Sequence, residues 1–467
     1  MLFNSVQFLV FFVAVLGLYW VLKHRAQNLL LLAASYVFYG AWNWKFLALI
    51  LLTTVADFTA SLVIANTDRA MRRKLALIAA IVVNLGVLGF FKYYNFFIED
   101  VLVALNWLGI AYVPLVLQIV LPVGISFYTF QSMSYTIDTY RGEVEPTTNF
   151  PDYALYVAFF PQLVAGPIER AGHLLKQIQT PRTVTIERIN EGVLLIALGL
   201  FKKVAIADHL AQYVDGAFDR QTGWKLLIAL YFFAFQIYCD FSGYSDIARG
   251  CAKLFGIDLR LNFNRPYFAR NLTEFWRRWH ISLSTWFRDY IYRPLGGKHA
   301  RGWRPYRNLM AVFLLSGLWH GAAWTFVIWG AIHGVILSLE KALSGWRRET
   351  PVHPPKHGLN PRNIVAVFVT FHIVCAAWVF FRAPTLDGAL GFFARLVQPA
   401  TIPFSGLMVF AHAFVALALL FAWEAFEERW RRLLVKPAVA IPGYAGLFIF
   451  TLAWGQLNGG QFIYFQF

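Results

Sequence analysis

The composition of this 467-residue chain is that of a membrane protein: 58% of its residues are hydrophobic and only 14% are charged, whereas soluble globular chains carry roughly 25% charged residues. The apolar surplus excludes a soluble globular protein and predicts an all-α polytopic membrane protein. The net charge of +16 does not indicate a nucleic-acid partner, because membrane proteins collect basic residues in cytoplasmic loops and beside anionic lipid headgroups.

Apolar segments dominate the beginning of the chain, and about 20 such residues suffice to span a membrane as a helix. No basic residue precedes the first segment and no small-residue cleavage site follows it, so we expect a retained span and not a signal peptide. The second segment is short, which indicates a tilted or partial span. The predicted spans are residues 2–22, 29–42, 46–64, 75–97 and 101–121.

Basic residues follow the first and third predicted spans. Because cytoplasmic loops carry the excess of lysine and arginine, these loops are predicted to be cytoplasmic and the N-terminus extracytoplasmic. The basic residues concerned are Lys23, His24, Arg25, Arg69, Arg72, Arg73 and Lys74.

The following segments are apolar but interrupted. Residues 123–137 include Gln131 and Tyr135, and residues 153–164 run into a stretch broken by proline and glycine. Polar or broken helices at membrane depth need protein or water around them, so both segments are candidates for lining a cavity or tunnel. Apolar stretches then recur at residues 192–207, 226–238, 309–339, 364–381, 407–423 and 438–454.

Residues 243–308 are not apolar enough to span, yet they are rich in aromatic and basic side chains. We expect this segment to pack on the helix bundle within a single transmembrane domain formed by residues 1–467. A stripe of aromatic and leucine side chains at steps of three or four residues predicts one continuous amphipathic helix; its members are Trp276, Trp279, Leu283, Trp286 and Tyr290.

The arginines of this segment permit two interpretations. In the first interpretation they only hold a helix to the phosphates of lipids. In the second they bind the phosphates of a cytosolic nucleotide-bearing donor, since arginine pairs with phosphate in a forked geometry. The candidates are Arg277, Arg278, Arg288 and the neighbouring Asp289.

Histidines stand out in the apolar context. His320 is flanked by Trp319 and Gly321 in the apolar run 309–339, which also contains His333, and His280 lies beside the aromatic stripe. A neutral imidazole can take a proton from a hydroxyl group and return it to a leaving group. The alternative is a histidine that only hydrogen-bonds between helices, or, for His280, one that lies on an interfacial helix.

Two carboxylates, Asp240 and Asp246, end an apolar helix near Ser242. Pairing with nearby arginines is the structural interpretation, because charges at membrane depth are usually neutralised in pairs. The sequence has no phosphate-binding glycine loop, no His-Glu-x-x-His pair and no Gly-x-Ser-x-Gly elbow. ATP hydrolysis and metalloprotease chemistry are therefore not expected, and no metal site is predicted.

The combination of Trp279-His280-Ile281-Ser282 with Leu318-Trp319-His320-Gly321 resembles the membrane-bound O-acyltransferase family. Residues 122–131, 160–170, 238–246 and 288–297 are similar to its bacterial alginate O-acetyltransferase branch. The resemblance implies a ring of about 10–12 transmembrane helices, with short or re-entrant helices, around a thin centre where a cytosolic and an extracytoplasmic funnel meet.

The resemblance also implies roles. His320 would be catalytic and His280 would support it, acetyl-CoA would be the donor with no bound cofactor, and the protein would lie in the bacterial inner membrane. An extracytoplasmic SGNH or esterase-like partner would pass the acetyl group to an exported polysaccharide. Further candidates for donor binding or tunnel lining are Trp319, Gly321, Gln131, Tyr135, Asp240, Ser242, Arg277, Arg278, Trp279, Ser282, Arg288 and Asp289.

Two rival functions stay open at this point. A polysaccharide or lipid transporter would also need many spans and a basic cavity, although transporters often show two repeated halves and none is visible here. A D-alanyl transferase of the same fold would use a carrier-protein thioester as its donor.

Overall fold

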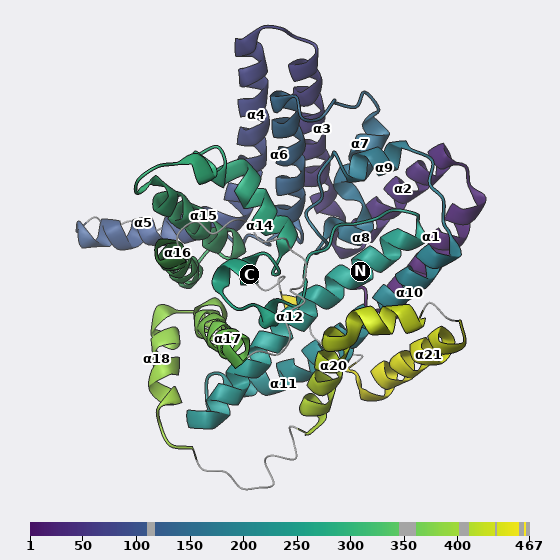
Figure 1. The fold of residues 1–467 in the computed structure, drawn as a ribbon. Helices are drawn as coiled ribbons and strands as arrows, with labels where there is room; N and C mark the ends of the chain where they lie inside the picture. The colour runs from purple at the N-terminus through teal and green to yellow at the C-terminus, as the bar shows by residue number, and fades with distance from the viewer. Residues whose placement is uncertain (110–116, 345–360, 401–410, 435–436, 457–461, 464–467) are drawn as a thin grey trace. The chain divides into compact units, whose positions relative to one another are not determined.

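The computed structural model describes residues 1–109, 117–344, 361–400, 411–434, 437–456 and 462–463. The regular elements in this part of the chain are all helical, which confirms the all-α class (Figure 1). The chain forms two compact units, one of residues 1–189 with 251–259 and one of residues 190–250 with 260–467. The single-domain organisation expected from the sequence stays a prediction.

The first unit contains the N-terminal helices. Asn43 adopts an extended backbone (φ −161°, ψ 108°) and separates the second helix from the short turn that precedes the third. The elements are α1 (Val6–Val21), α2 (His24–Asn43), η1 (Trp44–Phe46), α3 (Leu47–Ala65), α4 (Ala70–Leu88), η2 (Gly89–Tyr93), α5 (Tyr94–Trp107), α6 (Ile125–Arg141), α7 (Phe150–Ala158), α8 (Phe160–Leu163) and α9 (Leu174–Gln179).

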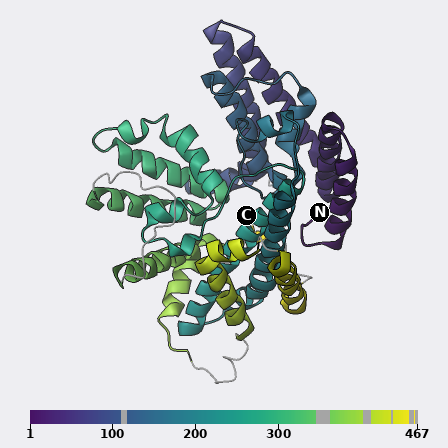
Figure 2. The same ribbon diagram turned by 45° about the vertical axis from the view of Figure 1, so that its right-hand side comes forward.

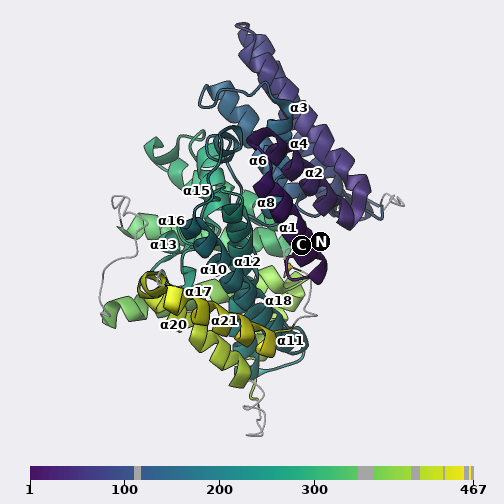
Figure 3. The ribbon, with the colours of Figure 1, turned by 90° about the vertical axis from the view of Figure 1, so that its right-hand side faces the viewer.

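Helices α3, α4 and α6 pack side by side (Figures 1 and 3), and one polar side chain from each helix meets the others between them. Asp57 is fully buried and accepts hydrogen bonds from Asn84 Nδ2 at 2.6 Å and from Thr136 Oγ1 at 2.5 Å. Leu52 and Val55 of α3, in contrast, are about half exposed. Polar groups inside and apolar groups outside is the pattern of helices surrounded by lipid.

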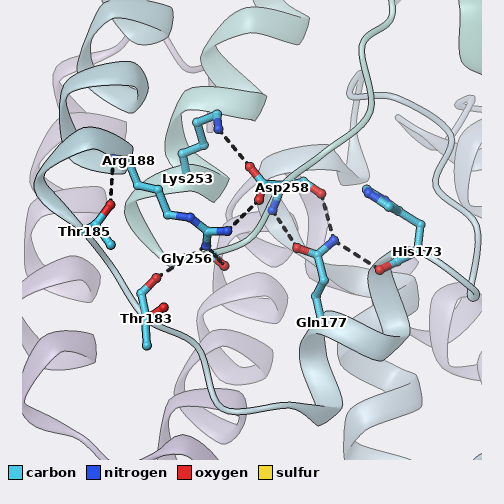
Figure 4. A network of polar contacts seen from close by, with 8 residues as sticks. All are labelled: His173, Gln177, Thr183, Thr185, Arg188, Lys253, Gly256 and Asp258. Carbon is cyan, nitrogen blue, oxygen red and sulfur yellow. Dashed lines mark hydrogen bonds and ion pairs between the residues drawn. The ribbon is translucent and has the colours of Figure 1, made fainter. Parts of the chain in front are cut away.

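The segment after α12 is held in the first unit by a polar network (Figure 4). Gln177 Nε2 donates to the carbonyl of Asp258 at 2.9 Å, and the Asp258 N–H donates to Gln177 Oε1 at 2.8 Å. The Asp258 carboxylate pairs with Lys253 at 2.8 Å and Arg188 at 2.9 Å. Burial alone would raise the pKa of Asp258, but the hydrogen bond and charge of Lys253, together with Arg188, hold it below its usual value.

The second unit contains the remaining elements. The elements are α10 (Ile186–Leu200), which begins in the first unit, η3 (Phe201–Ala207), α11 (Asp208–Ala217), α12 (Gly223–Leu254), η4 (Pro266–Phe268), α13 (Leu272–Trp276), α14 (Ile281–Phe287), η5 (Arg288–Tyr292), η6 (Gly297–His299), α15 (Arg304–His320), α16 (Trp324–Ser344), α17 (Pro361–Arg382), α18 (Leu386–Leu396), α20 (Ala411–Leu434) and α21 (Pro437–Trp454).

Glycines bring α10 and α12 into backbone contact within this unit. A Cβ added to Gly243 would lie 2.7 Å from the carbonyl oxygen of Gly199, and one added to Gly250 would lie 2.5 Å from that of Gly192. Small residues at such crossings let helix backbones approach closely. These contacts place the part of α12 that carries Asp240 and Asp246 against η3. The expectation that these carboxylates end the helix was wrong, because α12 continues to Leu254.

Five helical stretches of the described residues are long and apolar enough to cross a membrane, which agrees with a polytopic membrane protein. The larger ring and the two funnels stay predictions, as does the location of the N-terminus. The stretches are His24–Ala65, Ala70–Trp107, Gly223–Leu254, Trp324–Leu343 and Pro361–Arg382, and the shorter apolar helices Val6–Val21 and Pro442–Trp454 accompany them.

Two predicted spans take a different form. The stretch Ala70–Trp107 runs through the boundary expected between residues 97 and 101, because Ile98, Glu99 and Asp100 stand there and no proline or glycine interrupts the helix. The span predicted at 101–121 is helical only as far as Trp107 in its described part: Gly109 adopts a left-handed backbone (φ +72°), and residues 117–124 are not helical. Residues 110–116 of that prediction, and 407–410 of the later one, lie outside the described residues.

The apolar run 309–339 is a hairpin and not one continuous helix. Helix α15 ends at His320, Gly321 is extended (φ −157°, ψ 149°), and α16 starts at Trp324 and returns beside α15 (Figures 1 and 2). The break falls among small apolar residues, where hydropathy gives no signal. Its consequence is that His320 stands at a helix end.

Candidate active site

His320 is the last residue of α15 and is almost completely buried, with 3% of its surface exposed. Gly317 lets α15 and α16 pack closely beside this residue, because a Cβ on Gly317 would lie 3.0 Å from the carbonyl carbon of Phe326 on α16. The imidazole is surrounded by rings from α15, α16 and α17. Their centroids lie 4.9 Å away for Trp319, 5.1 Å for Trp329 and 5.3 Å for Phe381.

His280 precedes α14 and interrupts the helix predicted from the aromatic stripe. Its backbone is left-handed (φ 42°, ψ 54°), a conformation that is uncommon for residues other than glycine. Helix α13 therefore ends at Trp276 and α14 starts at Ile281. The prediction of one continuous helix was wrong, since steps of three and four residues fit two short helices as well as one long helix.

The two histidines face each other across a buried aromatic site. Their ring centroids lie 6.4 Å apart with an interplanar angle of 63°, and Trp319 contacts both rings, at 5.8 Å from His280. Phe241 of α12 stands edge-on against His280 at 4.7 Å. Both imidazoles therefore lie inside the protein, since His280 is fully buried and His320 is 3% exposed.

Burial lowers the pKa of His280 to about 3, so this imidazole is neutral at physiological pH. A pKa this low makes His280 a weak base, because efficient general bases have pKa values near the working pH. The ring can still donate and accept hydrogen bonds. This electrostatic environment suits an orienting role for His280 and leaves proton transfer to another group.

Comparison with known protein families identifies the family of this chain. The sequence profile of MBOAT, the membrane-bound O-acyltransferase family, matches residues 143–381, a range that includes both histidines. The chain belongs to the membrane-bound O-acyltransferase family. The protein is therefore a membrane-bound O-acyltransferase, and this assignment replaces the transporter alternative.

Relatives of this acyltransferase support the assignment over most of its length. It is 46% identical over 395 residues to "Probable alginate O-acetylase AlgI" of Pseudomonas aeruginosa, covering 83% of this chain and 73% of the relative. The protein of the same name in Azotobacter vinelandii is 44% identical over 402 residues, 85% of this chain and 78% of its own. "Peptidoglycan O-acetyltransferase" of Helicobacter pylori is 38% identical over 426 residues, 84% and 78% of the two chains.

Asn262 is a site residue that sequence reasoning missed. It is fully buried, and its Oδ1 lies 3.2 Å from His280 Nδ1. The same oxygen accepts from Ser282 Oγ at 2.9 Å, so the structure does bring the predicted residue Ser282 next to His280. No sequence pattern marks Asn262, because the two short helices η4 and α13 separate it from its partners in the chain.

Trp329 and Phe381 of the acyltransferase were also missed, since each contributes a ring to the wall around His320 from a separate helix. The predicted residue Trp279 lies deeper in the same unit, with its ring 5.1 Å from that of Trp378 and 5.1 Å from that of Phe263. Trp279 therefore belongs to the aromatic core that supports the site.

The predicted phosphate-binding arginines are largely engaged with acids. Arg278 pairs with Glu274 at 2.6 Å, and Arg288 pairs with Asp289 at 2.9 Å on the more exposed surface. Arg277 is half-buried beside Arg278. Arg278 or Arg288 would thus bind a donor phosphate beside a carboxylate that already neutralises part of its charge.

Asp240 and Asp246 are neutralised mainly by lysines, which corrects the expectation of arginine partners. Lys203 lies 2.8 Å from both Asp240 and Asp208, and Lys202 lies 2.8 Å from Asp246, which also has Arg249 at 3.3 Å. The lysines belong to η3, a π-helical segment, and such segments frequently occur at functional sites.

Asp240 also accepts a hydrogen bond from the backbone N–H of Ile463 at 2.6 Å. This contact fixes the end of the described chain beside α12, where the Phe462 ring lies 5.5 Å from that of Phe241. Ser242 is buried nearby on α12. These groups are adjacent to the histidine site through Phe241, whose ring lies 4.7 Å from that of His280.

Gln131 and Tyr135 lie on α6 of the first unit. Gln131 Nε2 donates to the carbonyl of Tyr156, and Gln131 Oε1 accepts from Gln162 Nε2 at 3.1 Å. Tyr135 OH accepts from the backbone N–H of Thr147 at 3.0 Å. Both side chains are buried among polar neighbours, as expected for a segment at membrane depth that needs protein around it.

Proposed function

We propose that this acyltransferase moves an acetyl group from cytosolic acetyl-CoA across the inner membrane for O-acetylation of an exported polysaccharide. The names of relatives at 38% to 46% identity, an alginate O-acetylase and a peptidoglycan O-acetyltransferase, support acetyl as the group transferred. An extracytoplasmic SGNH or esterase-like protein would receive the acetyl group and pass it to the glycan. The basic loops after the first and third predicted spans support an extracytoplasmic N-terminus.

The observation that carries the proposal is the buried pair of imidazoles, 6.4 Å apart between ring centroids and enclosed by aromatic side chains. A neutral imidazole in such a site can act as a base without competition from water. His320, at a helix end between two glycines, is the residue we assign to proton transfer. His280 is assigned to orientation, as its depressed pKa indicates.

In the proposed reaction His320 takes the proton of the acceptor hydroxyl group while the hydroxyl oxygen attacks the thioester carbonyl carbon. A C–O bond forms and the C–S bond breaks. The electron pair of that bond goes to the sulfur of CoA, which recovers the proton from His320. The alternative in which His320 itself is transiently acylated uses the same residue as nucleophile.

The experiment uses purified full-length protein in detergent with acetyl-CoA labelled in the acetyl group. We expect release of CoA and capture of the label by the protein or its partner, and loss of both in His320→Ala. His372→Ala is the matched control, because His372 is also on a predicted span but hydrogen-bonds Tyr231 at 2.6 Å, away from the site. Wild-type transfer by His320→Ala would refute the assignment, and transfer only from a carrier-protein D-alanyl thioester would refute acetyl-CoA as donor.

A further inference from the structure

Asn262 is buried, and both its side chain and its backbone bind the turn that carries His280. The Asn262 carbonyl oxygen accepts from the Ile281 N–H at 2.9 Å. Its Oδ1 accepts from the Ser282 N–H at 3.2 Å and from Ser282 Oγ at 2.9 Å. Its Nδ2 donates to Ser245 Oγ at 3.4 Å on α12. The two residues that follow His280 are thus fixed to one asparagine.

These contacts determine which end of the amide faces the histidine. A backbone N–H can only donate, so the atom that faces the Ser282 N–H must be the oxygen of the Asn262 amide. His280 Nδ1 lies 3.2 Å from that same oxygen. An unprotonated Nδ1 would set two lone pairs against each other, so Nδ1 carries the hydrogen and donates it to Asn262.

The tautomer of His280 follows, because a neutral imidazole has one N–H and one lone pair. With the hydrogen on Nδ1, the lone pair is on Nε2. Desolvation keeps the ring neutral, and the pKa of about 3 makes protonation of both nitrogens unfavourable at physiological pH. His280 is then a hydrogen-bond acceptor at Nε2.

Asn262 also supports an unfavourable backbone. A left-handed conformation costs a non-glycine residue roughly 1–2 kcal/mol, and His280 adopts it with φ 42°. The hydrogen bonds to the N–H groups of Ile281 and Ser282 hold the chain directly after that residue. Loss of the Asn262 side chain would therefore free the ring tautomer and remove the Ser282 N–H contact, while the backbone contact to Ile281 would remain.

We propose that Asn262 is a positioning residue that fixes His280 as the Nδ1–H tautomer and presents its Nε2 lone pair as a hydrogen-bond acceptor in the acyl-transfer site. The role in transfer rests on the function proposed above, whereas the tautomer does not. Asn262 acts through His280, and the hydroxyl of Ser282 shares the same oxygen.

The test combines a spectrum and a rate. In detergent-solubilised protein labelled with ¹⁵N-histidine, the imidazole signals of His280 are identified by their absence in His280→Asn. We expect a protonated Nδ1 and an unprotonated Nε2 in the wild type and in Asn262→Asp, which keeps an acceptor oxygen. In Asn262→Leu we expect a mixture of tautomers and a loss in kcat of about 10- to 100-fold, as for loss of a buried hydrogen bond, with the KM for acetyl-CoA within about threefold.

Asn264→Ala is the control, because Asn264 belongs to the same segment but uses only its backbone, donating to the Arg278 carbonyl at 2.9 Å. An Nε2–H tautomer in the wild type would overturn the proposal without any rate measurement. A wild-type tautomer and kcat in folded Asn262→Leu would also overturn it. Since the spectrum needs no acyl donor, absence of acetyl-CoA turnover would count against the proposed function and not against the tautomer.

Discussion

Replacement of Gly317 by alanine tests whether the tight α15–α16 hairpin sets the position of His320. The new Cβ would lie 3.0 Å from the carbonyl carbon of Phe326 and 3.3 Å from Val327 Cα, against an ordinary contact distance of at least 3.4 Å. The helices must therefore separate by at least 0.4 Å (3.4 − 3.0), and by more to clear the closer carbonyl oxygen of Phe326. Backbone atoms cannot swing aside as a flexible side chain can.

His320 follows Gly317 by less than one helical turn, so the displacement reaches its imidazole. A misplacement of about 1 Å can reduce catalysis about 10²-fold. For this displacement we expect kcat/KM to fall about 10- to 100-fold, which is about 1.4–2.7 kcal/mol of transition-state stabilisation. Acetyl transfer by the purified, folded variant is the measurement, with its thermal unfolding recorded alongside.

Gly334→Ala is the matched control on the same helix pair. Its Cβ would meet the Sδ atom of Met310 at 3.0 Å, and a methionine side chain adapts readily. We expect kcat/KM within about twofold of the wild type. If folded Gly317→Ala transfers acetyl groups at a rate as close to the wild type as this control does, the hairpin does not position His320.

Two more predictions concern buried charge. The free energy of unfolding lost in His280→Asn should become smaller at low pH. The pKa of His280 in the folded protein, about 3, lies below its ordinary value of 6.5, so the unfolded state binds one more proton as the pH falls. The wild type, but not the variant, therefore loses up to about 2 kcal/mol of stability between pH 6.5 and 5, at about 1.36 kcal/mol per pH unit. Denaturant unfolding in micelles at both pH values measures it, and an equal effect of pH on both proteins would contradict a buried neutral His280. Lys203→Met should destabilise the protein by about 3–5 kcal/mol, because it leaves the carboxylates of Asp208 and Asp240 buried without their cation. Asp208→Asn keeps the Lys203–Asp240 pair at 2.8 Å and should destabilise it less. The reverse order in thermal unfolding would refute this charge arrangement.

The sequence contained enough information for the helical membrane class and for the two histidines, because both depend on composition and local motifs. It could not reveal that Gly321 ends α15, since residues 309–339 are predominantly apolar and contain no proline, lysine, arginine, aspartate or glutamate to mark the turn. The left-handed backbone of His280 was equally hidden. That conformation depends on hydrogen bonds to Asn262, which come from another segment of the chain.

The partners of the buried carboxylates could not be predicted from the sequence either. Arginines near Asp240 and Asp246 in the sequence were the expected partners, but Lys202 and Lys203 reach them from η3. Their approach depends on the contact between Gly199 and Gly243, where two backbones meet. A glycine in an apolar helix has many uses, so its neighbour across the crossing cannot be named without the fold.

The backbone of His280 affects how inactive variants of this enzyme should be chosen. At a left-handed position asparagine and glycine are tolerated better than other residues, and a β-branched substitute would be a genuine outlier. An alanine at position 280 would combine loss of the imidazole with a local conformational penalty, so its phenotype would overstate the chemistry. His280→Asn separates the two effects and is the better knockout for complementation in cells.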